Sequence, residues 1–162
     1  MIFEIFAVIC ILGSLIRRAF TPPPVLIANI AEGIHGDGKV TKLTDAAITT
    51  RYLLYKPGSD ANHAAVSGAS EIPLGTIADE ASAAEEAVAV NVLGSTPGTL
   101  LMVASEAITQ GEHVFTAASG KVQDLPAGAG TYYELGIALT ASGADGDLIE
   151  VAHCVPRKTV VS

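Results

Sequence analysis

Hydrophobic runs of strand length, separated by short clusters of Gly, Pro, Asp and Ser, follow one another along most of this chain. The clearest alternation lies at 88–92, where Val88, Val90 and Val92 share one face and Ala89 and Asn91 the other. Other runs rich in apolar or β-branched residues occupy 25–33, 40–56, 64–79, 99–108, 111–123 and 148–155. Breaks at about every eight to twelve residues are typical of β-barrels and β-sandwiches. The pattern therefore predicts an all-β fold, either a small barrel or a sandwich.

Two of these segments allow a more specific prediction. The run at 111–123 predicts a hairpin whose turn lies near Ser119 and Gly120. The stretch "ADEASAAEEAVAV" at 78–90 is rich in Ala and Glu, which favour helix. It predicts either one or two helical turns or a loop packed against the sheet.

Two stretches of the chain resemble each other: "LGTIADEASAAEEAVAVNVL" and "LGIALTASGADGDLIEVAHC". Aligned without a gap, they share the pairs Leu74/Leu135, Gly75/Gly136, Ala83/Ala144 and Val90/Val151. In each stretch a glycine at a strand start precedes an acid-bearing turn and then a second strand, and glycine permits close backbone approach there. Upstream, "RYLLYKPGS" and "EHVFTAASG" both read as a strand followed by a turn. We expect two related β motifs that cover one core; chance similarity of two β segments is the alternative.

The first twenty residues, "MIFEIFAVICILGSLIRRAF", differ from the rest of the chain. The uncharged apolar run from Ile5 to Ile16 is shorter than the roughly 20 residues that cross a bilayer. Glu4 precedes it and Arg17 and Arg18 follow, whereas a secretory signal has its positive charge first. Three interpretations remain: a helical arm that docks into a neighbouring subunit, a short membrane anchor, or an extension produced by an upstream start codon.

Three consecutive prolines at 22–24 favour extended backbone and mark a domain boundary. We therefore expect an apolar, helical N-terminal arm with its proline linker at 1–24, a β-rich domain at 25–156 and a C-terminal tail at 157–162. The candidate assembly contacts are the large apolar residues of the arm: Ile2, Phe3, Ile5, Phe6, Ile9, Leu12, Leu15, Ile16 and Phe20.

The composition changes this picture only in part. Charged residues are 16% of the chain, well under the usual quarter, and the formal net charge is -8. An acidic chain lacks the clustered Lys and Arg that bind phosphates, so we expect no nucleic-acid partner. Low charge with many small apolar side chains fits a surface partly hidden in an assembly, or simply an Ala-rich globular domain. The two cysteines, Cys10 and Cys154, have no metal-type spacing and are expected to be free thiols.

The most tempting chemical motif is "GIHGDGKVT". Gly33, Gly38 and Lys39 match a phosphate-binding loop as far as the lysine. That loop next requires Ser or Thr to bind magnesium, and the chain has Val40 there. No clear helix follows whose N-terminus could hold a phosphate. We interpret the motif as a glycine-rich turn between strands.

The remaining polar groups predict no catalytic, cofactor or metal site. The four histidines are scattered and form no metal-binding pair: His35, His63, His113 and His153. The acid pairs Asp79-Glu80 and Glu85-Glu86 lie among small residues and are expected to be solvated turns. The sequence gives no reason to expect an enzyme.

The stretch "SEAITQGEHVFTAASGKVQDLPAGAGTYYELGIALTASGADGDLIEVAHC" resembles the capsid decoration, or cement, proteins of tailed bacteriophages. The likeness rests on an "AI-x-x-G-x-x-V" entry to a strand, then "GKV", then "LGIAL…A…DGDLIEV", and it extends over roughly 25–155. It implies a β-rich, non-catalytic protein on the outside of an icosahedral head, made in the host cytoplasm. Such a protein would bind the major capsid protein, bridge capsid subunits and often form trimers. The apolar arm departs from the family pattern.

A second hypothesis from another class is a membrane-anchored β-rich surface or assembly protein, held by the N-terminal arm. It predicts that detergent rather than salt releases the full-length chain, and that deletion of residues 1–20 makes it freely soluble. An enzyme that uses the acids or histidines would require a pocket in which two of these groups converge.

Overall fold

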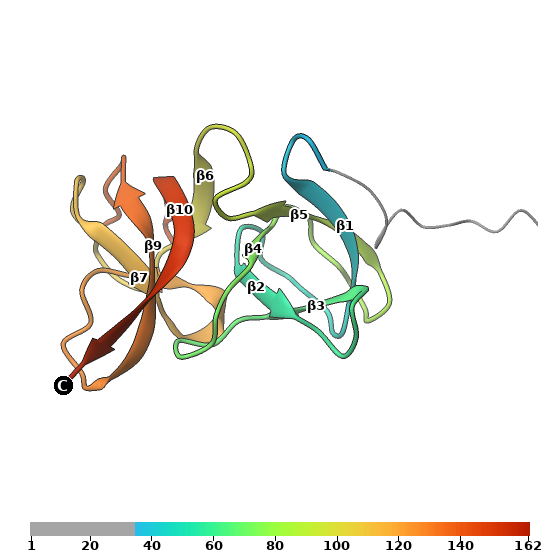
Figure 1. Cartoon of the computed structure of the whole chain (residues 1–162), viewed down its shortest axis with the longest axis horizontal. Helices are drawn as coiled ribbons and strands as arrows, with labels where there is room; N and C mark the ends of the chain where they lie inside the picture. The colour runs from blue at the N-terminus through green and yellow to red at the C-terminus, as the bar shows by residue number, and fades with distance from the viewer. Residues whose placement is uncertain (1–34) are drawn as a thin grey trace, which may run out of the picture.

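The computed structural model describes residues 35–162. The expected N-terminal arm, its proline linker and the strand expected at 25–33 lie outside the described residues. The described part is built from ten β-strands and one short 3₁₀ turn, which confirms the predicted all-β class. Figure 1 shows two groups of strands side by side along the long axis, with the first half of the chain in one and the second half in the other.

The first group is a closed five-stranded barrel. Its strands are β1 (Lys39–Thr44), β2 (Leu54–Pro57), β3 (His63–Val66), β4 (Gly75–Ile77) and β5 (Ala87–Val92). They follow one another around the barrel in the order β1-β3-β2-β4-β5, and β5 pairs with β1 to close it. Among the neighbouring strands of this barrel, β1 and β3 run parallel and every other pair is antiparallel. A barrel leaves no open edge along its paired strands.

The second group is a five-stranded sheet. Its strands are β6 (Leu100–Val103), β7 (His113–Thr116), β8 (Val122–Gln123), β9 (Gly130–Ala138) and β10 (Leu148–Val161), with the 3₁₀ turn at Ala118–Gly120. Their order is β6-β10-β9-β7-β8. β7 and β8 form the hairpin predicted at 111–123, with its turn at Ser119 and Gly120, so that prediction is confirmed.

The two halves repeat the same strand pairing in the same register. Gly75 pairs with Val92 between β4 and β5, and Gly136 pairs with His153 between β9 and β10. Both partners therefore lie 61 positions later in the second half. Gly75 also pairs with Tyr55 of β2 on its other side. In the second half, Gly136 pairs with Val114 of β7.

The last contact of the barrel is also repeated. In the first half Thr44 on β1 lies parallel to Ala64 on β3. In the second half Ala104, just after β6, makes a single parallel bridge to Val122 on β8. This bridge brings the two outer strands of the second sheet together as in the first barrel. We therefore call the halves the first and the second barrel; the repeat extends well beyond the two similar stretches found in the sequence.

The repeat explains why each stretch has a glycine at its second position. A Cβ added to Gly75 would lie 1.9 Å from the carbonyl oxygen of Asn91 on the paired strand. A Cβ added to Gly136 would lie 2.2 Å from the carbonyl oxygen of Ala152, which occupies the equivalent place in the second barrel. Both contacts are far inside van der Waals range, so only glycine fits where the two strands cross.

Two adjoining buried clusters form the cores of the two barrels. One buried cluster fills the first barrel: Ile48, Tyr55, Ala64, Ile77, Ala81, Val88 and Val90. The other fills the second barrel: Leu100, Met102, Ala104, Ile108, Val114, Val122, Leu135, Ala138, Ile149 and Val151. Leu54 and Leu93 come from the first half yet pack in the second cluster. The two motifs thus cover two adjoining clusters rather than the single core that the sequence suggested.

Hydrogen bonds reinforce the junction between the barrels. The backbone N–H of Gly120 donates to the carbonyl of Ser67 at 2.7 Å. The N–H of Gly94 donates to Nδ1 of His153 at 3.0 Å. Since each bond joins one half to the other, neither barrel is free to move independently at these points.

The structure decides between two local alternatives and differs from one expected boundary. The Ala-rich stretch forms no helix: it is a loop that packs against the barrel and then continues as β5, the second of the two predicted alternatives. Ala81, only 2% exposed, exchanges two backbone hydrogen bonds with Ile48, so the backbone groups that a helix would use are already paired. The expected tail at 157–162 instead extends β10 to Val161, because Arg157–Val161 pairs with Gly130–Glu134 of β9.

Candidate functional site

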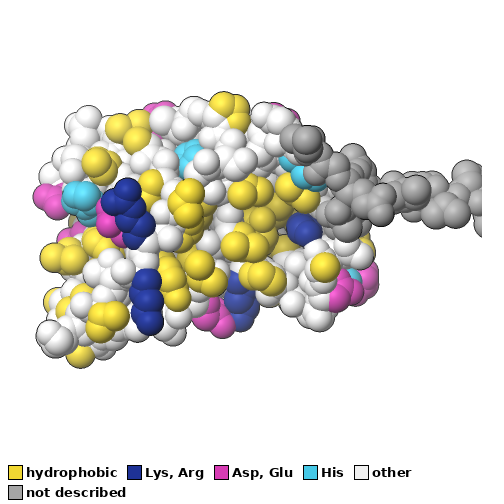
Figure 2. Space-filling view, in the orientation of Figure 1, with side chains coloured by type: hydrophobic (Ala, Val, Ile, Leu, Met, Phe, Trp, Pro, Cys, Tyr) yellow, Lys and Arg dark blue, Asp and Glu magenta, His cyan; other side chains and the backbone are white. Residues whose placement is uncertain are grey.

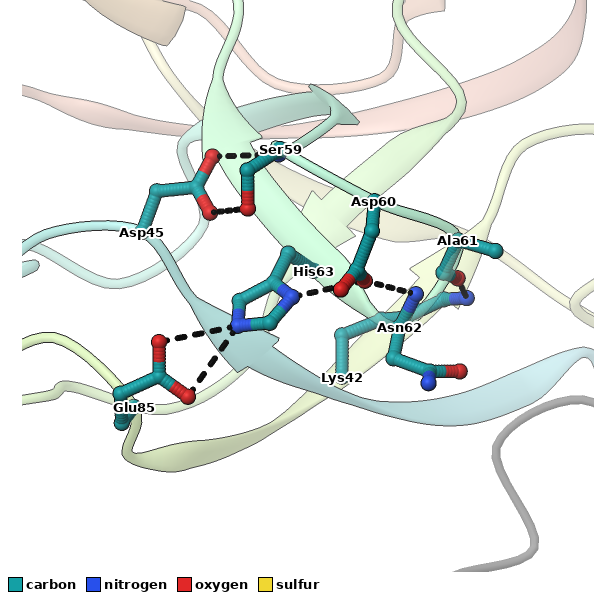
Figure 3. Close-up of polar contacts among 8 residues, drawn as sticks. All are labelled: Lys42, Asp45, Ser59, Asp60, Ala61, Asn62, His63 and Glu85. Carbon is teal, nitrogen blue, oxygen red and sulfur yellow. Dashed lines mark hydrogen bonds and ion pairs between the residues drawn. The ribbon is translucent and has the colours of Figure 1, made fainter.

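A polar corner at the start of β3 brings several charged side chains together. His63 lies between two carboxylates: its Nδ1 is 2.7 Å from Asp60 and its Nε2 is 3.1 Å from Glu85. Next to it, Asp45 accepts hydrogen bonds from the backbone and the hydroxyl of Ser59. Figure 3 shows this arrangement.

The polar corner is a structural clamp rather than a catalytic dyad. The hydrogen bond that His63 makes to Asp60, and then the one to Glu85, raises the pKa of His63 above its ordinary value. The hydrogen bond to His63 lowers the pKa of Asp60 in turn. When it is protonated, the imidazole donates from both nitrogens, one to each carboxylate. It ties the β2–β3 turn to the β4–β5 loop.

The second barrel carries a cation–carboxylate pair in the corresponding corner. Lys121, just before β8, donates to Asp145 in the β9–β10 loop at 2.6 Å. This pair borders an open hollow of about 430 Å³ that is also lined by Ser105 and Gln123. Both corners therefore join a hairpin turn to the long acidic loop, which indicates a role in the fold of the repeat.

The acidic residues predicted as solvated turns cap those turns. Glu86 accepts a hydrogen bond from the backbone N–H of Ser82 at 2.7 Å, and Asp147 accepts one from Gly143 at 2.8 Å. The hydrogen bonds from Ser82 lower the pKa of Glu86. Within residues 35–162 no group of three or more His, Cys, Asp or Glu is placed to hold a metal ion.

The remaining titratable groups of interest are also held in structural contacts. Burial lowers the pKa of His153, which accepts from Gly94 as a neutral ring. His113 lies 2.9 Å from Glu134 on the exposed side of β9. Burial raises the pKa of Cys154, a free cysteine, so it remains a protonated thiol and a poor nucleophile.

Several large apolar side chains remain exposed, and those that gather in two places form the candidate functional site. The first lies at the junction of the barrels, where Ile72 is 50% and Leu74 40% exposed. Leu74 is hydrogen bonded to Leu93, and the next residue, Gly94, abuts Val155 of the second barrel. Figure 2 shows hydrophobic side chains gathered over the middle of the molecule, where β2 and β4 lie in Figure 1.

The second exposed apolar region is the outer side of the second barrel. Leu101 on β6 lies directly opposite Glu150 on β10, and the N–H of Leu139, which follows β9, donates to the carbonyl of Glu150. Leu148, two residues before Glu150, is on the same side of β10 and is 49% exposed. We call these three leucines around Glu150 the leucine face. Ile137, 41% exposed, extends it along β9.

The first barrel has small or polar residues at the equivalent positions. Thr41 lies opposite Ala89, and the N–H of Ala78 donates to the carbonyl of Ala89, which matches the row of Leu101, Glu150 and Leu139. Ala87 stands at the place of Leu148. The barrel fold therefore forms without leucines on its outer side. Exposed apolar residues that the fold does not require indicate an interaction surface.

The comparison with protein families agrees with this architecture. A family model described as phage cement protein matches residues 35–153, which include the first barrel and the second as far as His153 in β10. The chain belongs to the phage cement protein family. Among curated proteins, no match to the sequence was found. This cement protein is therefore a phage structural protein, and its family is a structural rather than a catalytic one.

The match has a further consequence for the sites predicted from the sequence. The arm residues from Ile2 to Phe20 lie outside both the described residues and the matched range. The leucine face lies within the matched range, and sequence reasoning did not single it out because strand-length apolar runs were interpreted only as strands. One signal was present in the two similar stretches, where Ala87 aligns with Leu148; the equivalence of Thr41 and Leu101 follows from the strand pairing. In residues 35–162 the cement protein has no helix long and apolar enough to span a membrane.

Proposed function

We propose that this cement protein binds the outer surface of the phage head and bridges neighbouring copies of the major capsid protein. The observation that carries the proposal is the family match over both barrels. The surface supports it: residues 35–162 combine an acidic, turn-capped scaffold with exposed apolar regions at the barrel junction and on the leucine face.

Such a protein would act through linkage rather than chemistry. A ligand that binds the assembled shell but not its free subunits stabilises the shell; at a concentration of about 100 times Kd the gain is roughly 2.7 kcal/mol for each site. Many symmetry-related sites multiply a modest affinity. The compact double barrel suits this role, because a rigid ligand loses little conformational entropy on binding.

We further propose that the protein acts as a homo-oligomer, in the simplest case a trimer, and that the apolar arm from Ile2 to Phe20 contributes its assembly contacts. Oligomers with closed symmetry are the rule, and a threefold ligand matches local threefold positions of an icosahedral shell. The arm is apolar along most of its length and is joined to the barrels by a proline-rich linker.

The test uses heads purified from a phage that lacks this gene, to which the purified full-length protein is added. We expect saturable binding with a fixed number of copies for each head, and a higher temperature of DNA release from decorated heads than from bare ones. Binding should persist at low detergent concentration. A protein that fails to sediment with heads, or that sediments only with lipid vesicles, would contradict the proposal and support a membrane-anchored role.

A further inference from the structure

We propose that the leucine face receives the apolar N-terminal arm of a second copy of this chain, so that copies are linked head to tail. The inference rests on the assembly role proposed for the arm and names the surface that the arm would occupy. It begins from the difference between the two barrels.

Comparison of the two barrels shows which outward-facing residues the barrel fold requires. The row Thr41–Ala89–Ala78 in the first barrel and the row Leu101–Glu150–Leu139 in the second have the same backbone pairing. The leucines at 101 and 139 are each 38% exposed, and neither belongs to the buried cluster of its own barrel. Their presence is explained by a partner that covers them.

The chemistry of the leucine face matches the arm. The face is apolar around one carboxylate, Glu150, whose Oε1 accepts a hydrogen bond from the hydroxyl of Thr99. An occupant must cover the leucines and also offer a donor to the carboxylate, because a buried charge without a partner is costly. The arm has an uncharged apolar run from Ile5 to Ile16 followed at once by Arg17 and Arg18. Arginine pairs well with a carboxylate in a partly buried site.

The point at which the described part begins favours a second copy over the same copy. That point, His35, lies beside β1 in one group of strands, and Figure 1 shows β6, β9 and β10, which form the leucine face, in the other group. The linker at 21–34 spans at most about 50 Å when fully extended. An arm that leaves the first barrel of one copy and reaches the second barrel of the next makes a heterologous contact. Such contacts close into rings when the rotation permits.

The experiment measures the oligomeric state of the full-length protein by analytical ultracentrifugation over a range of concentrations. One variant replaces the leucines with the residues of the first barrel: Leu101→Thr, Leu139→Ala and Leu148→Ala. A second lacks residues 2–20. The matched control is Val160→Thr, which removes an apolar side chain that is 67% exposed but lies outside the leucine face. Circular dichroism and thermal melting establish that each variant folds.

We expect the wild type and the control to associate, and the leucine variant to weaken association at least tenfold, on the order expected for loss of central apolar contacts. Deletion of the arm should weaken association to the same degree. A protein with both the leucine substitutions and the deletion should associate little more weakly than either variant alone. Glu150→Arg should also weaken association, and Arg17→Glu with Arg18→Glu should partly restore it.

Three results would overturn the inference. They are a leucine variant that associates like the wild type, a wild type that stays monomeric at all concentrations, and additive effects of the two changes. Head binding by the same variants separates this inference from the proposed function. A leucine variant that still associates but no longer binds heads would assign the face to the shell; variants that lose association but still bind heads would leave the capsid-binding role intact.

Discussion

Substitution of Gly136 by alanine tests the strand crossing that is common to both barrels. The added Cβ would lie 2.2 Å from the carbonyl oxygen of Ala152 and 2.9 Å from Cα of His153, so the backbone of β9 or β10 must move. Overpacking of this kind costs about 1–3 kcal/mol. Gly136 also has a φ of +148°, a region that L-residues rarely adopt, which adds a further cost of roughly 1–3 kcal/mol.

The expected total is about 3 kcal/mol, which lowers the melting temperature by roughly 10 °C for a domain of this size. Gly143→Ala is the matched control in the same barrel. Its Cβ would meet only a side-chain oxygen of Asp147, at 3.6 Å, which is ordinary contact. Differential scanning calorimetry at neutral pH compares the two variants with the wild type. If Gly136→Ala melted within about 2 °C of Gly143→Ala, the close crossing of the strands and the account of the repeated Leu-Gly would be refuted.

Three further predictions concern buried or paired polar groups. Thr76→Val should stabilise the protein by about 1 kcal/mol in urea titration, because Thr76 Oγ1 is buried without a hydrogen-bond partner; a loss of stability would contradict this. The folded-state pKa of His63 is raised, so the stability that its ion pairs contribute is present below a pH of about 6.5 and is lost as the pH rises through the folded pKa. His63→Gln should therefore lower the melting temperature more at pH 6 than at pH 8. An equal loss at the two pH values would refute the clamp. The folded-state pKa of His153 is lowered, so the wild type should lose stability as the pH falls below about 6.5, whereas His153→Gln should lose less; parallel curves for the two proteins would show that His153 does not titrate this way.

Much of the fold follows from local sequence patterns. The period-two pattern at Val88 and Val90 is β5, with both side chains buried, and the hairpin around Ser119 is β7 and β8. These features depend on neighbouring residues, which the sequence shows directly. The similarity of the two Leu-Gly stretches was detectable because a backbone crossing admits only glycine.

The extent of the repeat was not predictable in the same way. The alternation of buried and exposed residues and the turns maintain the register of the strands. Outward-facing side chains at equivalent positions of the two barrels can differ freely, as Thr41 and Leu101 do. The strand at 157–161 was missed because its partner on β9 begins at Gly130, far upstream, and its charged start reads as a tail. The clamp at His63 was hidden for a similar reason: Glu85 approaches only when the barrel closes.

Some of the scattered histidines and acid pairs have a structural role. Two of the histidines and the acid Glu86 hold turns or the junction between barrels, through contacts that involve backbone groups or residues distant in sequence. Fixed hydrogen bonds of this kind make a rigid scaffold. Exposed apolar side chains remain for recognition, and those at the barrel junction and on the leucine face are the candidates.

The most direct test of the central claim is a cryo-EM map of phage heads with and without this protein. We predict additional density on the outer surface of heads that contain it, into which two fused five-stranded barrels fit as one rigid body across a boundary between capsid subunits. Heads with identical outer surfaces in the two maps would contradict the claim, as would density confined to the interior of the shell.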